Sequence, residues 1–354
     1  MNNPNIACVD LFCGAGGLTH GLIQAGVPVV AGVDSEESCR YPYEVNNEGA
    51  VFYKRDITLL ETEEVTSWFG NAGIRILAAC APCQPFSSYT KHLDVKSSKK
   101  FAMIDYVTNI ITKIKPEIVV MENVPRVTKF EPFNKFEAVL KLLGYEVSRL
   151  VVDSSNYGAA QHRNRTILIA SVIGRIGVPT TIKFHPKTVR DAIGDLPPIA
   201  NGESDSNDPL HISAKLSSLN LERVRASKPG GTWRDWPEHL VTNCHGKDSG
   251  STYKHVYGRM EWNKPSPTIT TQFCGFSNGR FGHPEQDRGL SLREGARLQG
   301  FPDWYRFAPS NKPIKITKVS KLIGNAVCVD LAKAIGRSIM SHVEKNFTSG
   351  KFEK

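Results

Sequence analysis

Short apolar, β-branched runs alternate with longer amphipathic stretches over the first 170 residues. This alternation is typical of strand–helix–strand units in a parallel sheet. The predicted strands are Ile6–Phe12, Val29–Val33, Ile74–Ala79, Ile118–Met121, Tyr145–Val152 and Thr166–Val172. The predicted helices are Gly17–Ala25, Glu36–Asn46, Glu61–Trp68, Met103–Ile114 and Phe133–Leu143. The pattern therefore predicts an α/β fold with a doubly wound, mostly parallel sheet.

The texture of the chain changes after Gly174. Proline, glycine and polar clusters, such as Pro197-Pro198 and Lys228-Pro229-Gly230-Gly231, interrupt every long periodic segment. Helical spacing returns at Val327–His342. We therefore expect a second, loop-rich region, followed by a final helix that packs back on the first domain.

Composition narrows the class of protein. With 354 residues, 22% charged and 40% hydrophobic, the chain is typical of one large or two modest globular domains. No apolar run approaches the roughly 18–20 residues of a membrane helix, and Met1–Pro4 has no feature of a signal peptide. The eight cysteines lack the spacing of a disulfide framework. We expect an intracellular, cytoplasmic protein with reduced thiols and no membrane contact.

The net charge of +9 is unevenly distributed. Residues 1–150 carry 15 basic and 17 acidic side chains, so the remaining residues carry a net +11. An asymmetry of this kind indicates a polyanion partner for the later part of the chain. Solvated surface charge is an equally good explanation at this point.

A glycine-rich turn follows the first predicted strand. Gly14 and Gly16 lie between this strand and a predicted helix, where glycines let a ligand approach the backbone at a helix N-terminus. Thr19 stands where the dinucleotide fingerprint requires a small apolar residue, which argues against a nicotinamide cofactor.

Two carboxylates extend this candidate pocket. Asp34 closes the second strand, 20 residues after Gly14, at the place expected for a ribose-binding carboxylate. Asp56 could accept a bond from an adenine amino group. Either residue alone could simply cap the helix that follows it. Together with the glycine turn, they indicate a pocket for an adenosine-bearing cofactor without a pyrophosphate.

Candidate chemistry gathers beyond two later strands. Cys83 lies on a proline-flanked loop after the strand Ile74–Ala79, and Glu122 ends the next strand, so both should reach the ligand crevice of the sheet. The Cys80-x-x-Cys83 spacing also permits a zinc or redox motif, but no second pair at zinc spacing exists. A thiol nucleophile beside a carboxylic acid suits attack on an electron-poor ring.

Two arginines complete the candidate site. Arg163 and Arg165 lead into a predicted strand, and alternation should project both on one side. Fixed cations near a thiol lower its pKa or bind phosphate.

These segments, in this order, resemble the DNA (cytosine-5) methyltransferases over nearly the whole chain. The matching segments are Asp10–Gly17, Asp34, Asp56-Ile57, Pro82–Ser87, Glu122–Val124, Gln161-x-Arg163-x-Arg165, Arg259–Thr270 and Gly324–Val327. One departure is Ala81, where the family usually has a second proline before the cysteine. The nucleophile is retained.

The resemblance implies a mechanism. Cys83 adds as thiolate to C6 of cytosine, which makes C5 nucleophilic toward the methyl group of S-adenosylmethionine. Glu122 serves the cytosine N3 and amino group, while Arg163 and Arg165 hold O2 and a nearby phosphate. Because C6 is inaccessible in a stacked duplex, the base must be flipped into the pocket.

The resemblance also assigns binding residues and domains. Cofactor contacts fall on Phe12, Gly14, Gly16, Gly17, Leu18, Asp34, Ser35, Asp56, Ile57, Pro82, Met103, Asn325 and Ala326. Candidate DNA contacts are Gln84, Ser87, Arg234, Lys254, Arg259 and Arg280, whereas Trp233 and Trp236 suit the core of a small domain. No metal is expected. Residues 1–178 and 320–354 form the predicted S-adenosylmethionine-binding catalytic domain, and residues 179–319 form a smaller, loop-rich target-recognition domain.

The expected partner is double-stranded DNA, and the protein is expected to bind it as a monomer. We expect it to belong to a restriction–modification or phage-defence system, in which a restriction endonuclease or another defence protein could be a further partner. Two alternatives are a tRNA cytosine-C5 methyltransferase and a non-catalytic nucleic-acid-binding relative. The charge fits DNA binding, since residues 1–178 are neutral, residues 179–319 carry +6 and residues 320–354 carry +3. The recognition sequence does not follow from any spacing in the chain.

Overall fold

The computed structural model describes residues 5–82, 102–177, 179, 181, 185–245, 247 and 256–348. Contacts between Cα atoms divide the chain into two compact units. Unit 1 comprises Met1–Tyr157, Asn164–Ile182 and Val327–Lys354, and unit 2 comprises Gly158–Arg163 and Lys183–Ala326. Each unit is therefore built from segments that are distant in the sequence.

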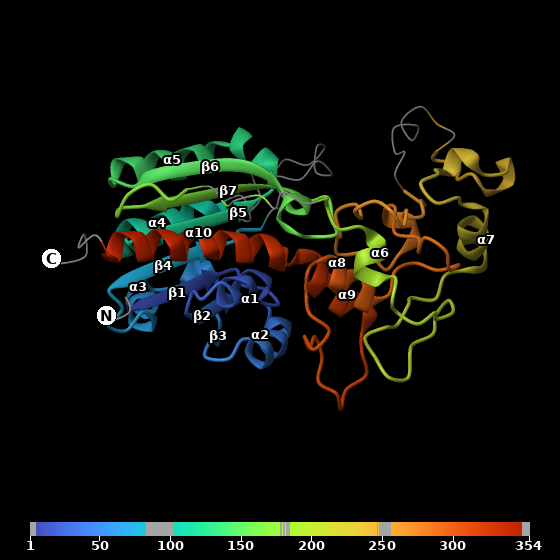
Figure 1. Ribbon diagram of the computed structural model, residues 1–354, viewed down its shortest axis with the longest axis horizontal. Helices are drawn as coiled ribbons and strands as arrows, with labels where there is room; N and C mark the ends of the chain where they lie inside the picture. The colour runs from blue at the N-terminus through green and yellow to red at the C-terminus, as the bar shows by residue number, and fades with distance from the viewer. Residues whose placement is uncertain are drawn as a thin grey trace. The chain divides into compact units, whose positions relative to one another are not determined.

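Unit 1 contains a seven-stranded sheet with the order β3-β2-β1-β4-β5-β7-β6 (Figure 1). The strands are β1 (Ile6–Leu11), β2 (Val29–Asp34), β3 (Val51–Lys54), β4 (Ile74–Ala79), β5 (Ile118–Asn123), β6 (Glu146–Asp153) and β7 (Asn164–Ser171). The pairs from β3 to β5 are parallel, and β7 is antiparallel to both of its neighbours. The predicted α/β, mostly parallel fold is confirmed.

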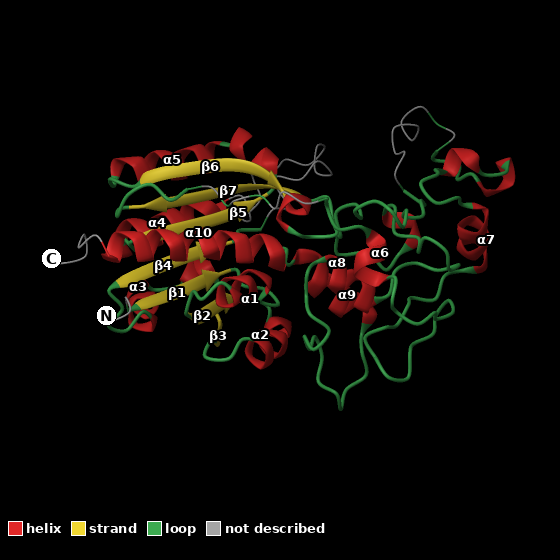
Figure 2. Ribbon diagram, in the orientation of Figure 1, coloured by secondary structure: helices red, strands yellow, loops and turns green. Residues whose placement is uncertain are grey.

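Helices cover the sheet of unit 1 (Figure 2). They are α1 (Gly17–Gln24), α2 (Arg40–Asn46), α3 (Thr62–Trp68), α4 (Met103–Ile114), α5 (Glu131–Leu142) and α10 (Val329–Thr348). Short 3-10 helices are η1 (Glu37–Cys39), η2 (Ile57–Leu59), η7 (Pro125–Lys129) and η8 (Ser154–Tyr157). None of the helices in the described part of the chain is long and apolar enough to cross a membrane.

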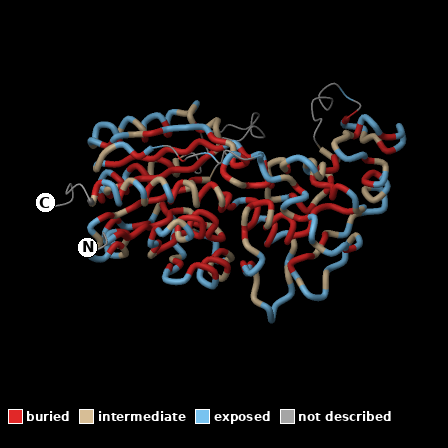
Figure 3. Tube along the Cα trace, in the orientation of Figure 1, coloured by how far each residue is buried: buried red, intermediate tan, exposed pale blue. Residues whose placement is uncertain are grey.

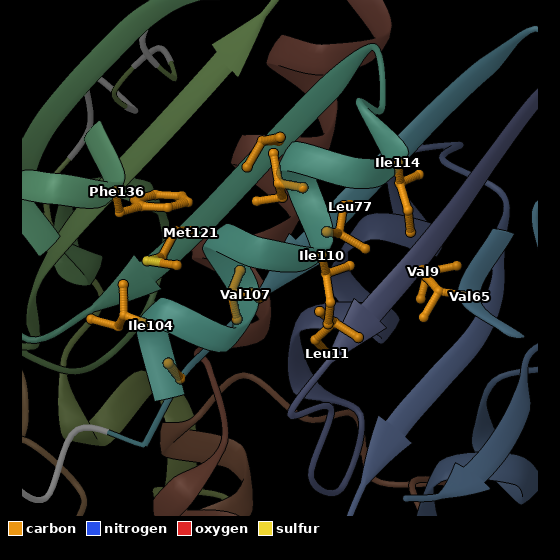
Figure 4. Packing of buried hydrophobic residues seen from close by; sticks show 14 of the residues in the cluster. Val9, Leu11, Val65, Leu77, Ile104, Val107, Ile110, Ile114, Met121 and Phe136 are labelled. Carbon is orange, nitrogen blue, oxygen red and sulfur yellow. The ribbon is translucent and has the colours of Figure 1, made fainter. Parts of the chain in front are cut away.

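Apolar side chains at helical spacing hold α4 against the sheet. Ile104, Val107 and Ile110 are buried in one cluster with Leu77 and Met121 of β4 and β5 (Figure 4). The central strands are buried on both faces (Figure 3), because their near-continuous apolar runs lie between helices. This rigid core fixes where the strands end, and the candidate site residues follow those ends.

Two local differences from the prediction have physical causes. β3 was not among the predicted strands: it is a four-residue edge strand, and its Val51 side chain is exposed. The predicted helix from Glu36 begins instead with η1 and becomes α-helical at Arg40. Asp34 accepts the backbone N–H of Glu36, which turns the chain before the helix starts.

Unit 2 consists mostly of loops between short helices (Figure 2). Its helices are α6 (Val189–Ile193), α7 (Ser218–Ala226), α8 (Leu292–Leu298) and α9 (Ile316–Asn325), with the 3-10 helices η9 (Trp233–Asp235), η10 (Glu238–Leu240) and η11 (Phe276–Asn278). Trp233, Trp236 and Phe276 are buried in one apolar cluster. The interpretation of the two tryptophans as core residues is therefore confirmed.

Candidate active site

The glycine turn after β1 adopts the backbone that its sequence predicts. Gly14 and Gly16 have φ angles of 54° and 90°, in the left-handed region that favours glycine. Gly16 is the N-cap of α1 and provides no capping side chain. A Cβ added at Gly14 would meet no atom within 4 Å, so open space lies beside this backbone. Gly17 and Leu18 begin α1 and are buried.

Asp34 connects this turn to the end of β2. One carboxylate oxygen accepts the N–H of Gly14 at 3.0 Å, and the other accepts the N–H of Glu36 at 3.0 Å. Burial raises the pKa of Asp34 above its usual value, and these two bonds partly oppose that rise. The carboxylate therefore shapes the turn that the neighbouring glycines form. Ser35 follows it and is exposed.

The remaining predicted cofactor residues of unit 1 also lie at element ends. Asp56 accepts bonds from the N–H and hydroxyl of Thr58, both at 2.9 Å, so it caps η2 as the simpler interpretation of this residue expected. Ile57 is buried at the start of η2. Phe12 follows β1, Pro82 comes shortly after β4, and Met103 is the first residue of α4. All three are half-buried.

Glu122 lies at the carboxyl end of β5 and is 2% exposed. Arg165 of β7 places its Nε 2.8 Å from Glu122 Oε1. Oε1 accepts no hydrogen bond from the described residues, so this contact is an ion pair alone. The thiol of Cys80 lies 2.9 Å from the other oxygen, Oε2. Glu122 is thus a buried carboxylate with one charged and one weakly polar neighbour.

The segment that leads toward Cys83 is anchored beside Glu122. The Asn123 side-chain amide donates to the carbonyl of Ala81 at 3.0 Å, and Cys80 N–H donates to the carbonyl of Leu11 at 3.2 Å. These bonds fix Cys80 and Ala81, which precede Cys83 in the sequence. Three predicted site residues lie outside the described residues: Cys83, Gln84 and Ser87.

The two arginines have different partners. Arg163 is 5% exposed and donates to the carbonyls of Ile269 at 2.9 Å and Ala326 at 3.1 Å, all within unit 2. Arg165 pairs with Glu122 within unit 1. β7 begins at Asn164, so Arg163 precedes the strand and the alternation that should place both arginines on one side does not apply to it. Strand alternation therefore does not support the prediction that both arginines project on one side.

The C-terminal motif ends α9 of unit 2. A Cβ at Gly324 would lie 2.3 Å from the carbonyl carbon of Thr270, so this close approach requires glycine. Asn325 is exposed, and the buried Ala326 accepts the Arg163 bond through its carbonyl. The motif thus packs the end of α9 against residue 270.

The candidate DNA contacts differ in exposure. Arg259 is 5% exposed and donates to the carbonyls of Val224, Ser227, His283 and Gln286. Arg280 is half-buried and donates to the carbonyl of Gly231 at 2.8 Å. Arg234 is exposed, with its guanidinium over the Trp233 ring. Lys254 lies outside the described residues. Arg259 therefore has a structural role that its sequence did not reveal.

Sequence reasoning also missed two contacts of the site. Cys80 was considered only as half of a metal or redox pair, and the amide of Asn123 was not assigned a role. The register of β4 on β5 pairs Ala79 with Met121, so the next residues, Cys80 and Glu122, are neighbours. This strand register would have revealed the contact between Cys80 and Glu122. It could not be used, because the sequence alone does not show how the strands pair.

The model of the C-5 cytosine-specific DNA methylase family matches residues 6–341. The chain belongs to this family. The methylase is 47% identical over 343 residues to the Type II methylase M.HgiDII of Herpetosiphon aurantiacus, with 96% of each chain covered. It is 27% identical to DNA (cytosine-5)-methyltransferase 4 of Arabidopsis thaliana, where 94% of this chain covers only 28% of that longer protein.

The fold of the methylase is also similar to solved structures. A DNA modification methyltransferase encoded within an Escherichia coli prophage superposes with a TM-score of 0.74 at 22% identity, covering 96% of this chain and 99% of that chain. At this identity the likeness supports the fold alone. It agrees with the mostly parallel sheet described above.

Proposed function

We propose that this methylase transfers the methyl group of S-adenosylmethionine to C5 of cytosine within a specific duplex DNA sequence. Family membership over residues 6–341 supports the reaction class. The observation that carries the proposal to individual residues is the placement of Glu122 at the end of β5. There it faces Arg165 and lies beside the anchored residues that lead toward Cys83.

The residues around the glycine turn fit an adenosine-bearing cofactor. The space beside Gly14 and the uncapped N-terminus of α1 leave room for a ligand close to the backbone. We assign the ribose hydroxyls to Asp34, the adenine to Phe12, Asp56 and Ile57, and further contacts to the other residues predicted for cofactor binding. When bound, S-adenosylmethionine supplies an electrophilic methyl group on its sulfonium.

The chain's own residues provide the remaining chemistry. The Cys83 thiolate forms a bond to C6 of the flipped cytosine, and electron density moves to C5. A proton shared between Glu122 and N3 offsets the negative charge that develops on the ring, and the ion pair with Arg165 keeps the Glu122 side chain in place. After methylation, a base removes the C5 proton, and the C6–sulfur bond breaks to regenerate the thiolate.

We assign substrate recognition to residues 179–319 and catalysis to residues 1–178 and 320–354. Residues 179–319, close to the range of unit 2, carry a net +6, which suits contacts with DNA phosphates. The exposed Arg234 is the best-placed described candidate for such a contact. The likeness to a Type II methylase supports a role in restriction–modification. We further propose that the enzyme acts as a monomer in the cytoplasm.

The test is methyl transfer from labelled S-adenosylmethionine to DNA and, in parallel, to tRNA. We expect transfer to DNA alone, at cytosines that bisulfite sequencing will locate within one short sequence. Cys83→Ser should abolish turnover and retain cofactor binding. Transfer only to tRNA contradicts the DNA assignment, and no transfer to either substrate contradicts the enzymatic one. A wild-type rate in Cys83→Ser contradicts the covalent mechanism.

A further inference from the structure

Cys80 occupies a defined position next to the carboxylate of the site. It follows β4 directly, and its N–H donates to the carbonyl of Leu11, which continues the ladder between β4 and β1. The β4–β5 register then brings its side chain to Glu122, where Sγ and Oε2 are 2.9 Å apart. The thiol is therefore held at the carboxylate by the backbone of two neighbouring strands.

The two oxygens of Glu122 have neighbours of very different strength. Oε1 faces the permanently charged guanidinium of Arg165 at 2.8 Å. Oε2 faces the neutral thiol of Cys80, and a thiol is a weak hydrogen-bond donor. An entering base that needs one carboxylate oxygen can displace the thiol at a smaller free-energy cost than the guanidinium. Oε2 is therefore the oxygen that can be exchanged.

We propose that Cys80 is a positioning residue: its thiol holds the Glu122 carboxylate in the DNA-free enzyme and yields Oε2 to the amino group of the target cytosine. This inference rests on the proposed function of Glu122. The exchange replaces one hydrogen bond to Oε2 with another, so the carboxylate stays oriented before and after the base enters. The weakness of the thiol as a donor is what makes the exchange easy.

The thiol can be tested apart from the loop that follows it. Asn123 holds the carbonyl of Ala81 through its side-chain amide, and Cys80 is tied to Leu11 through its backbone. Neither bond uses the Cys80 side chain. A substitution of Cys80 therefore removes or changes the Oε2 contact and leaves both anchors in place.

The experiment compares steady-state methylation by Cys80→Ala and Cys80→Ser. Alanine removes the donor, so the carboxylate is less well oriented; we expect kcat to fall about fivefold, with no rise in KM for DNA. Serine restores a donor, and a hydroxyl competes more strongly than a thiol for Oε2. We expect a kcat within about twofold of wild type and a KM for DNA about threefold higher.

Cys8→Ala is the control, because it removes a buried thiol from β1, which β4 separates from the strand of Glu122. It should leave kcat and KM at wild-type values. Cofactor binding by calorimetry checks that each variant is folded. If Cys80→Ala does not fold, Cys80→Ser alone tests the inference. A higher KM for DNA with an unchanged kcat supports it, and a wild-type KM contradicts it.

Two outcomes would overturn the inference. One is wild-type kcat and KM in both Cys80 variants. The other is an equal loss of kcat in both, which would indicate packing by sulfur rather than a hydrogen bond. A wild-type enzyme that methylates no DNA instead contradicts the proposed function itself, so the two failures can be distinguished.

Discussion

Two buried glutamates, one in each unit, face an arginine in very different ways. Glu294 of unit 2 accepts both ends of the Arg288 guanidinium, at 2.8 and 2.7 Å, and also the N–H of Ser291 at 2.7 Å. Among the described residues, Glu122 of unit 1 has an ion pair with Arg165 and a contact with the thiol of Cys80. Both carboxylates are almost completely buried, so the difference lies in their partners.

The difference agrees with the proposal that Glu294 supports the fold and Glu122 the chemistry. Burial alone raises the pKa of Glu294, but the bonds from Arg288 outweigh this effect and hold the pKa below its usual value. This pair is satisfied within unit 2 and has nothing to offer a ligand. Glu122 Oε1 accepts no hydrogen bond from the described residues, which agrees with the proposal that this carboxylate meets a substrate.

The largest effect is expected for Glu122→Gln. The amide has no acidic proton to give to N3 as negative charge develops on the cytosine ring, so kcat should fall about 10²- to 10⁴-fold. Methyl transfer to DNA with labelled cofactor measures this. The loss of stability should be smaller than for the same change at Glu294. A variant with more than half of the wild-type rate would remove Glu122 from the mechanism.

The matched substitution in unit 2 is Glu294→Gln. It leaves the fully buried Arg288 without its anion, and breaking such a pair lowers the free energy of unfolding by about 3–5 kcal/mol. Urea denaturation measures the loss. The folded fraction should methylate DNA with a kcat close to wild type. Unchanged stability would mean that the two glutamates do not differ as proposed.

Asp10 of unit 1 extends the comparison to pH. Burial raises its pKa to about 7, opposed in part by the Thr19 hydroxyl at 2.7 Å, and its Oδ1 accepts no hydrogen bond from the described residues. The folded pKa of Asp10 exceeds its unfolded pKa. The stabilising contribution of Asp10 is therefore fully present below about pH 4 and is lost as pH rises to about 7. The shift of roughly three units corresponds to about 4 kcal/mol at most.

Asp10→Asn should remove this component of the pH dependence. We expect the free energy of unfolding of the variant, relative to wild type, to increase between pH 4 and pH 8. Urea denaturation at several pH values measures it. Parallel curves for the two proteins would show that Asp10 does not titrate in this range.

The smallest effect is expected at the exposed Arg234 of unit 2, for which the buried Arg259 is the contrast. Arg234 is exposed, so Arg234→Ala should weaken DNA binding and lower the slope of log K against log salt by about one, with no change in stability. Arg259 is buried among backbone carbonyls, so Arg259→Ala should lower stability instead. Binding titrations at several salt concentrations, with denaturation as the control, measure both. Equal salt slopes for wild type and Arg234→Ala would exclude a phosphate contact.

The sequence alone determined the fold class and the order of the motifs. Apolar runs such as Ile118–Met121 predict parallel strands, because a strand that is covered on both faces has apolar side chains on both faces. Local rules also predicted the glycine turn, since Gly14 and Gly16 permit φ angles that other residues avoid. The edge strand β3 was not predicted, because it has four residues and only one of them is buried, so its sequence shows no run of apolar core positions.

Only the tertiary structure decided which charges remain available. Arg163 and Arg165 are two residues apart, yet one binds carbonyls of unit 2 and the other pairs with Glu122. The buried role of Arg259 and the contact of Cys80 with Glu122 were likewise not legible in the chain. The sequence states which chemical group each residue carries. The hydrogen-bond partners of that group are residues far along the chain, and strand register and packing decide which of them come close.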